Sequence, residues 1–205
     1  LDGHHVSIGY GELVKRLASE LVDAGSTVLA VDLSAQTARM AERFFVLQHN
    51  AMQPTLMGEA NFGRAVAIYL LLPNERDNLA LLDAVVADVN ELQKRPTIHV
   101  RYQSRHLGQL FADLAGHKAG AARSSLDIRP FNPFDLAARG LINSFAPDLY
   151  GDIDRAGPIT QTVMIVGTSA IAESIMRRLA RIGIYSPGGK LRVIWAGDGT
   201  SDAFA

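Results

Sequence analysis

The 205-residue chain contains no cysteine, a single tryptophan, and no apolar run long enough to cross a membrane. The absence of cysteine excludes disulfide bonds, thiol nucleophiles and cysteine metal sites, and it is compatible with a reducing cytoplasm. The longest apolar run, Ala65–Leu72, instead predicts a buried parallel strand. Because 20 basic residues nearly balance 21 acidic ones, the composition argues against a nucleic-acid partner, which needs a concentrated positive surface.

Metal-binding patterns are also scarce. The histidines are scattered, without the paired spacing that metal sites use, so we expect surface or capping histidines and no metal site. They are His4, His5, His49, His99, His106 and His117. No signal peptide is visible, and the chain begins at Leu1 and not at methionine. We therefore expect it to be part of a longer protein, whose membrane segments, if any, lie outside it.

What the sequence does contain, near its N-terminus, is a strand, a glycine pair, a helix and a second strand. The run His5–Ile8 leads into Gly9 and Gly11, a helix-period stretch follows, and Thr27–Val31 precedes Asp32. In a dinucleotide-binding βαβ unit, two such glycines let the backbone approach a pyrophosphate at the helix N-terminus. The later carboxylate accepts hydrogen bonds from ribose hydroxyls. Spacing and context both fit this pattern.

The pattern departs from its usual form at the third glycine. Leu13, Leu17, Leu21 and Val22 predict the apolar face of the helix, but Val14 stands where a glycine normally allows close packing on the strand. We therefore expect the helix to lie slightly further from the sheet. This substitution weakens the prediction of a bound nucleotide more than the prediction of the fold.

The rest of the chain alternates strands and helices at short spacing. Strands are predicted at Phe44–Gln48, Ala65–Leu72, Thr97–Tyr102 and Ser125–Arg129, and helices or helical turns at Ser34–Arg43, Pro54–Met57, Glu75–Leu92, Ser104–Leu114 and Pro133–Phe145. Buried-looking strands that alternate with helices predict an α/β fold, a Rossmann-like doubly wound parallel sheet. The last of these helices either offers an apolar surface to a partner or covers the sheet edge.

The opening pattern recurs near the C-terminus. A polar segment, 146–161, reads as a linker, and placing Gly9 on Gly167 aligns further positions without a gap. The aligned pairs are Val6 with Met164, Ile8 with Val166, Leu13 with Ile171, Leu17 with Ile175, Leu21 with Leu179 and Gly25 with Gly183. We predict a first domain at 1–145, a linker at 146–161, and the truncated start of a second Rossmann-like unit at 162–205. Its strand Leu191–Ala196 does not end in an acid, so this copy reads as a scaffold.

Several of these stretches together resemble one family. The opening LDGHHVSIGYG, the acid Asp32, the tripeptide His49–Ala51, the stretch LLLPNERDNLALL and the strand sequence IHVRYQS resemble the RCK (TrkA-N) domain, a Rossmann-type regulatory module of potassium channels and transporters. The resemblance covers residues 1–145, and TVMIVGTSAIAESIMRRLARIG resembles the start of a second such domain. It implies a homodimer or larger ring, built partly through Pro133–Phe145. It also implies a membrane pore or transporter subunit as partner, and a cytoplasmic location at the inner face of the membrane.

The resemblance also implies a ligand site for NAD(H) or for ATP or ADP. Gly9 and Gly11 would face the phosphates, Asp32 the ribose and Asn50 the base, and Arg101 would lend positive charge.

Two further departures from the family pattern count against a ligand. Glu12 places a carboxylate near the phosphates, and Asn50 replaces an aspartate. A site that keeps the fold and has lost its ligand is therefore the alternative.

Two of the candidate residues have structural interpretations as well. Asp32 either accepts from a ribose or simply caps the end of its strand. Arg101, unusual in a buried strand, either reaches a ligand or pairs with a carboxylate.

Enzyme chemistry is the rival class of function. The sequence has neither a P-loop nor a nucleophile elbow, and no tyrosine is followed by a lysine four positions later. We therefore expect no catalytic residues and a regulatory role. The alternatives are the cofactor-binding domain of a nicotinamide-dependent oxidoreductase, or a Rossmann assembly module that binds no ligand.

Overall fold

The computed structural model describes residues 1–33, 43–88, 95–104, 107–110, 127–146, 160–182 and 190–197. The chain divides into two compact units, Leu1–Phe131 and Asn132–Ala205. The helix predicted at Pro133–Phe145 thus groups with the second unit and not with the first. The predicted domain limits, 1–145, 146–161 and 162–205, remain a prediction.

A six-stranded parallel sheet forms the centre of the first unit, in the order β3-β2-β1-β4-β5-β6. Its strands are β1 (His5–Ile8), β2 (Val28–Asp32), β3 (Phe45–Gln48), β4 (Ala67–Leu70), β5 (Thr97–Arg101) and β6 (Ile128–Phe131). The strand order reverses between β1 and β4, which is the doubly wound arrangement. The predicted Rossmann-like fold is therefore confirmed.

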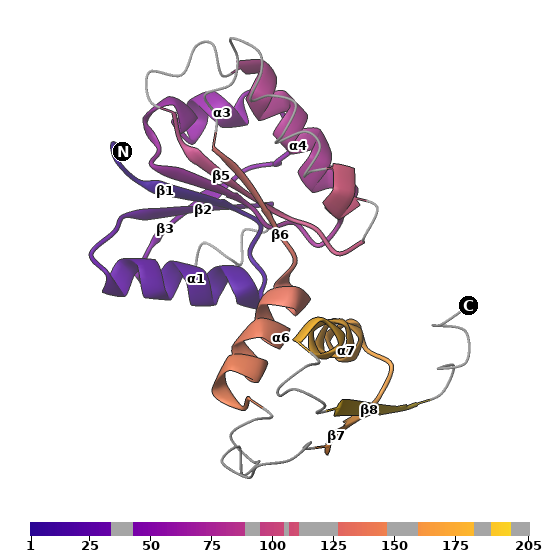
Figure 1. Cartoon of the computed structure of the whole chain (residues 1–205). Helices are drawn as coiled ribbons and strands as arrows, with labels where there is room; N and C mark the ends of the chain where they lie inside the picture. Colours follow the sequence, from indigo (N-terminus) through magenta and orange to yellow (C-terminus); the bar gives the residue numbers. More distant parts are fainter. Residues whose placement is uncertain are drawn as a thin grey trace. The chain divides into compact units, whose positions relative to one another are not determined.

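Helices cover both faces of this sheet. The helix α1 (Glu12–Asp23) lies on one face, while α3 (Leu56–Glu59) and α4 (Glu75–Asp88) lie on the other, together with a short 3₁₀ turn at Phe62–Arg64 (Figure 1). The face under α3 and α4 holds the larger core, which includes Ile8, Phe62 and Leu82. Burial on both faces explains why the strands read as continuous apolar runs.

The side of α1 that packs on the sheet differs from the predicted one. The residues of α1 that are buried are Val14 and Ala18, while Leu13 is exposed. Val14 packs with Ala30 of β2 and with Leu71, so the small side chain of Ala30 gives the valine room. Val14 therefore serves as a core residue at the position of the usual third glycine.

The second unit contains a smaller βαβ element. The second unit begins with α6 (Pro133–Ser144), and the βαβ element consists of β7 (Thr160–Val166), α7 (Ala170–Ile182) and β8 (Lys190–Ala196). β7 and β8 pair in parallel, and α7 packs on them through a core that includes Ala172 and Leu179. A second Rossmann-like start follows the first unit, as the sequence predicted.

Some predicted elements lie outside the described residues. These are the helix Ser34–Arg43 except for its last residue, the end of the helix Glu75–Leu92, parts of the helix Ser104–Leu114, the start of the strand Ser125–Arg129, most of the linker 146–161, and the histidines at 106 and 117. Within the described ranges, no helix combines the length and the apolar character that crossing a bilayer requires.

Candidate functional site

The predicted site residues lie where the strands of the first unit end. Gly9 follows β1, Asp32 ends β2, Asn50 follows β3 by two residues, and Arg101 ends β5. In parallel sheets all carboxyl ends share one edge, and ligands bind where the strand order reverses. Here that point lies between β1 and β4, directly beside Gly9. The topology therefore brings these residues to one edge of the sheet.

Gly9 has a backbone conformation that favours glycine. Its φ is +105°, and a Cβ atom at this position would lie 3.3 Å from the carbonyl oxygen of Leu71. Its N–H donates to the carbonyl of Val31 at 2.9 Å. The turn after β1 is thus fixed between the ends of β2 and β4.

Gly11 is the N-cap of α1 and lies in open space. Its φ of −78° suits any residue, and a Cβ there would meet nothing within 4 Å. Gly11 has no side chain with which to cap α1, although unpaired N–H groups at a helix start normally attract a capping side chain at this position. Packing among the described residues of the first unit therefore gives no reason for a glycine here. A phosphate that approaches the helix N-terminus would use both the missing side chain and the N–H groups.

Charged groups flank this helix start. Glu12 is the first residue of α1 and is exposed, so its carboxylate lies near the expected phosphate position. The ammonium of Lys15 lies 5.3 Å from the centre of the Tyr10 ring, one turn further along. A cation thus accompanies the carboxylate at the same helix end.

Asp32 lies at the end of β2 and is half-buried. Its backbone carbonyl accepts from His49 N–H at 3.0 Å, which joins the ends of β2 and β3. The position therefore suits a ribose-binding acid, while its use as a strand-end cap stays an alternative.

Asn50 is engaged in its own turn. Its Oδ1 accepts from the N–H of Met52 at 3.0 Å, and its carbonyl lies 2.8 Å from His49 Nδ1. A side chain that holds a turn in this way is typical of asparagine in loops. A contact with a base would use its amide nitrogen or the second lone pair of Oδ1. The predicted base contact remains a prediction.

Arg101 presents an unpaired group at the edge of the sheet. Its Nε is buried and has no hydrogen-bond partner among the described residues. The pairing with a carboxylate that the sequence left open does not occur there. A buried N–H without a partner needs an explanation, since nearly all such groups in folded proteins are paired.

Two residues that position this edge escaped the sequence prediction. Asn78 is completely buried, and its side chain bonds both the N–H and the carbonyl of Leu72 at 2.9 and 3.0 Å, and the carbonyl of Arg101 at 3.1 Å. Asn78 thus ties the segments after β4 and at the end of β5 together. The signal was a polar residue in the apolar stretch LLLPNERDNLALL, which was read only as part of a family pattern.

Glu75, at the start of α4, holds the segment after β5. Its Oε2 accepts from the N–H groups of Gln103 and Ser104 at 2.7 and 2.8 Å. Partial burial acts to raise the pKa of Glu75, but these hydrogen bonds outweigh it and keep the pKa below its ordinary value. Glu75 therefore stays ionised as a fixed acceptor at neutral pH.

Three of the histidines do not fit the surface or capping role that the sequence predicted. His4 is completely buried, and its Nε2 lies 3.0 Å from the carbonyl of Ala60. His5 and His99 stack on either side of Tyr69, with ring centres 6.0 and 4.7 Å away. Adjacent strands carry these three rings, so they form a column across the sheet. A part-buried column is not visible from single positions in the sequence.

The second βαβ element closes the equivalent positions. Ser169 takes the place of Gly11, and its Oγ accepts from the N–H of Ala172 at 3.4 Å. By strand register, Gly197 is the residue of the second copy that corresponds to Asp32 in the first. A Cβ at Gly197 would lie only 2.8 Å from Thr168 Cγ2. The indole of Trp195 also donates to the carbonyl of Gly167. The scaffold interpretation of this copy therefore has a structural basis.

Residues 6–120 match the TrkA-N domain when the chain is compared with protein families. Comparison with curated protein sequences finds no match. Among solved structures, the fold resembles that of GsuK bound to ADP, at 16% sequence identity and a TM-score of 0.62, over 98% of this chain. That match covers 46% of the GsuK chain, so this chain spans about half the length of its relative.

Two further structures match less of the chain. The TrkA-N domain of the inner membrane protein YbaL from Escherichia coli is 16% identical with a TM-score of 0.53, over 70% of this chain and 97% of that one. The Kef C-terminal domain from Shewanella denitrificans in its AMP-bound form is 16% identical with a TM-score of 0.52, over 73% and 82%. At these identities the likeness concerns the fold.

Proposed function

The chain belongs to the TrkA-N domain family, and from this premise we propose that it is a regulatory module that senses an adenine nucleotide. The module would control a channel or transporter for potassium or another cation. The single observation that carries the nucleotide proposal is the uncapped N-terminus of α1 with the unobstructed Gly11 in front of it. A glycine without a packing reason, at a helix end without a cap, is what a phosphate site needs.

The other predicted site residues support the same ligand. Asp32 would accept from the ribose, Gly9 would hold the turn, and Arg101 would offer its unpaired Nε from the neighbouring part of the edge. Glu12 opposes a phosphate, but a carboxylate in contact with solvent repels it only weakly, and Lys15 lies on the same helix end. The ligand class is therefore NAD(H), ATP, ADP or AMP.

Relatives of this fold bind such ligands. GsuK has been solved with ADP, the GsuK channel with NAD, and the Kef C-terminal domain with AMP. We extend nucleotide binding to this chain on the strength of its own edge geometry. The regulatory role, and the absence of catalysis, rest on its family.

A membrane pore or transporter subunit is the proposed partner, and the proposed location is the cytoplasmic side of the membrane. The proposed oligomer is a homodimer or a larger ring. Leu136 and Leu141 of helix α6 and its C-cap residue Phe145 are each more than 40% exposed, which supplies an apolar face for such an assembly. Analytical ultracentrifugation tests this part, because a strict monomer at high concentration would contradict it.

One observation favours the ligand-free assembly module as a second candidate. The Oδ1 of Asn50 already accepts a hydrogen bond from the N–H of Met52, so the residue predicted to contact the base has a hydrogen-bond partner without a ligand. An oxidoreductase domain has no comparable support, and no group of three or more potential metal ligands occurs in the described part of the chain.

Isothermal titration with NAD, NADH, ATP, ADP and AMP separates the two candidates. We expect saturable binding of at least one of them, weakened about tenfold or more in Asp32→Ala because ribose contacts are lost. The matched control is Asp83→Ala, an exposed aspartate on α4. Absence of binding to all five would refute nucleotide sensing and leave the assembly module.

A further inference from the structure

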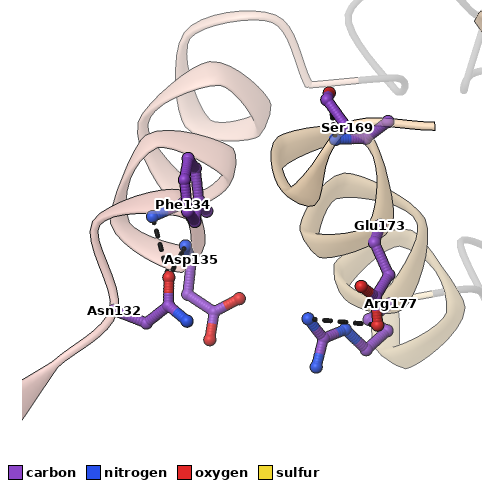
Figure 2. A network of polar contacts seen from close by, with 7 residues as sticks. Asn132, Phe134, Asp135, Ser169, Glu173 and Arg177 are labelled. Atoms are coloured by element: carbon purple, nitrogen blue, oxygen red, sulfur yellow. Dashed lines mark hydrogen bonds and ion pairs between the residues drawn. The ribbon is translucent and has the colours of Figure 1, made fainter. Parts of the chain in front are cut away.

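Helices α6 and α7 of the second unit enclose a polar pocket. Its lining consists of Asp135 from α6 and of Ser174, Arg177, Arg178 and Arg181 from α7. Positions 174, 177, 178 and 181 follow helical spacing, so the four α7 side chains lie on one face. Figure 2 shows Asp135 and Arg177 extending from the two helices into the space between them.

Several polar atoms of the residues that line this pocket are buried and have no hydrogen-bond partner in the described part of the chain. Ser174 is only 3% exposed, and its Oγ forms no hydrogen bond among the described residues. The Nε atoms of Arg177 and Arg178 are likewise buried and unpaired there. Groups of this kind are costly to leave unsatisfied, so three of them on one helix face indicate a missing acceptor.

The charge around the pocket is also incomplete. Arg177 has one acidic neighbour, Glu173, with Nη2 and Oε1 3.6 Å apart. Asp135 makes no ion pair with the arginines in the described structure. Three guanidinium groups thus stand against two carboxylates. Only the carboxylate of Glu173 forms an ion pair with one of them, and that ion pair is long. The pocket keeps a net positive charge.

We propose that this pocket binds the phosphate group of a small ligand. A phosphate offers several acceptor oxygens pointing in different directions, which matches two unpaired Nε–H groups and one hydroxyl on the same helix face. Arginine is well suited to this task because its planar fork can donate twice to one anion. The site is independent of the nucleotide site proposed at the end of β1, since all its residues belong to the second unit.

The N-terminus of α6 does not contribute to the site. Asn132 already accepts from the N–H groups of Phe134 and Asp135 at 2.9 and 3.4 Å. Figure 2 shows this cap at the start of α6. Binding would therefore depend on the α7 side chains, and Asp135 would oppose it by charge repulsion. The proposal therefore predicts that removing an arginine of α7 weakens phosphate binding and that removing the carboxylate of Asp135 on α6 strengthens it.

Titration of the 205-residue chain with inorganic phosphate tests the proposal. We expect saturable binding that weakens about tenfold or more in Arg178→Gln, because a charge-assisted hydrogen bond is lost. The matched control is Arg192→Gln, which removes the same charge from an exposed position on β8 and should leave affinity unchanged. Equal loss in the two variants would refute the site, because it would reveal a general charge effect.

A second variant keeps the test decisive if Arg178→Gln folds poorly. Asp135→Asn should bind phosphate several-fold more tightly, because it removes the opposing carboxylate. Unchanged or weaker binding in Asp135→Asn would overturn the proposal, as would the absence of phosphate binding to the unaltered chain. Competition with AMP then separates the sources: displacement indicates a nucleotide phosphate, and its absence indicates free phosphate, and either result keeps the site.

Discussion

The first βαβ element, β1–α1–β2, and the second, β7–α7–β8, share a glycine with positive φ directly after the first strand: Gly9 at 105° and Gly167 at 114°. Both glycines donate their N–H to a backbone carbonyl of the neighbouring strand: Gly9 to Val31 at 2.9 Å and Gly167 to Ala196 at 2.8 Å. The two elements differ two residues later, where Gly11 is open and Ser169 caps its own helix. The first glycine therefore belongs to the fold, and only the second one is specific to the proposed ligand site.

Burial differs as much as the site does. Val6 and Ile8 are 0% exposed, while the aligned Met164 and Val166 are 65% and 78% exposed. β1 lies inside a six-stranded sheet with helices on both faces, whereas β7 pairs only with β8 among the described strands. The same local pattern thus specifies the same element, and the surrounding chain decides which side chains are buried.

The largest expected effect concerns the carboxyl-terminal edge of the six-stranded sheet, to which the first element belongs and the second does not. Asn78→Ala should lower the free energy of unfolding by about 3 kcal/mol, since it leaves buried backbone groups of Leu72 and Arg101 without partners. Urea unfolding measures this change. Asn143→Ala, at an exposed position on α6, is the control and should change stability by less than about 0.5 kcal/mol. Similar values for both would show that Asn78 does not hold the edge.

The two shared glycines should respond unequally to the same substitution. Gly9→Ala should cost about 2 to 3 kcal/mol, because it adds a contact of 3.3 Å with Leu71 to an unfavourable φ. Gly167→Ala should cost about 1 kcal/mol, because its surroundings are open and only the conformation is strained. Thermal unfolding of both variants gives the comparison. A larger loss at Gly167 would contradict it.

Exchanging the helix caps should make each element resemble the other. Ser169→Ala should cost about 1 kcal/mol by removing the cap of α7. Gly11→Ser should be neutral or stabilising by a few tenths of a kcal/mol, because a serine can cap α1 in the open space there. The same variant should weaken nucleotide binding by placing a side chain in the phosphate position. Substantial destabilisation in Gly11→Ser would mean that the space is not open.

The smallest expected effect is a pH dependence confined to the first unit, which contains all the histidines of the chain. Burial lowers the pKa of His5, as does its neighbour His4, and burial together with Arg129 lowers the pKa of His99. The unfolded chain therefore binds more protons below about pH 6.5, so the stabilising contribution is complete above that pH and is lost as the pH falls through the lowered values.

Unfolding measurements between pH 7 and 5 test this dependence. Stability should fall with pH over that range, and the slope should decrease in His99→Gln. A slope that stays the same in this variant would assign the dependence to other groups.

Most of the fold could be predicted from the sequence because periodicity and glycine position are local signals. The strand His5–Ile8 was predicted with its observed limits, and the helix at Glu75 was predicted from its first residue onward. The buried face of α1 was less predictable, since Leu13 and Val14 are adjacent and both apolar. Which of them meets the sheet depends on the small Ala30 of another strand.

The site was predictable in position and less so in chemistry. The spacing placed Gly11 and Asp32 at one edge, but it could not reveal that Asn50 bonds to Met52 or that Asn78 joins two strand ends. Such side chains bond to backbone groups far along the chain or in their own turn, and neither leaves a periodic pattern. Arg177, Arg178 and Arg181 of α7 were not singled out in the sequence, because the unpaired Nε atoms of the first two become apparent only when α6 packs against α7.

Hydrogen–deuterium exchange with and without a saturating nucleotide tests the central claim most directly, because it reports on both elements in one sample. The account predicts that the nucleotide slows exchange at residues 9–15, at the open end of α1. Residues 167–173, at the capped end of α7, should be unaffected, and the protection at 9–15 should be lost in Gly11→Ser. Protection at 167–173 alone, or equal protection at both helix ends, would contradict the claim that only the first element retains a ligand site at the N-terminus of its helix.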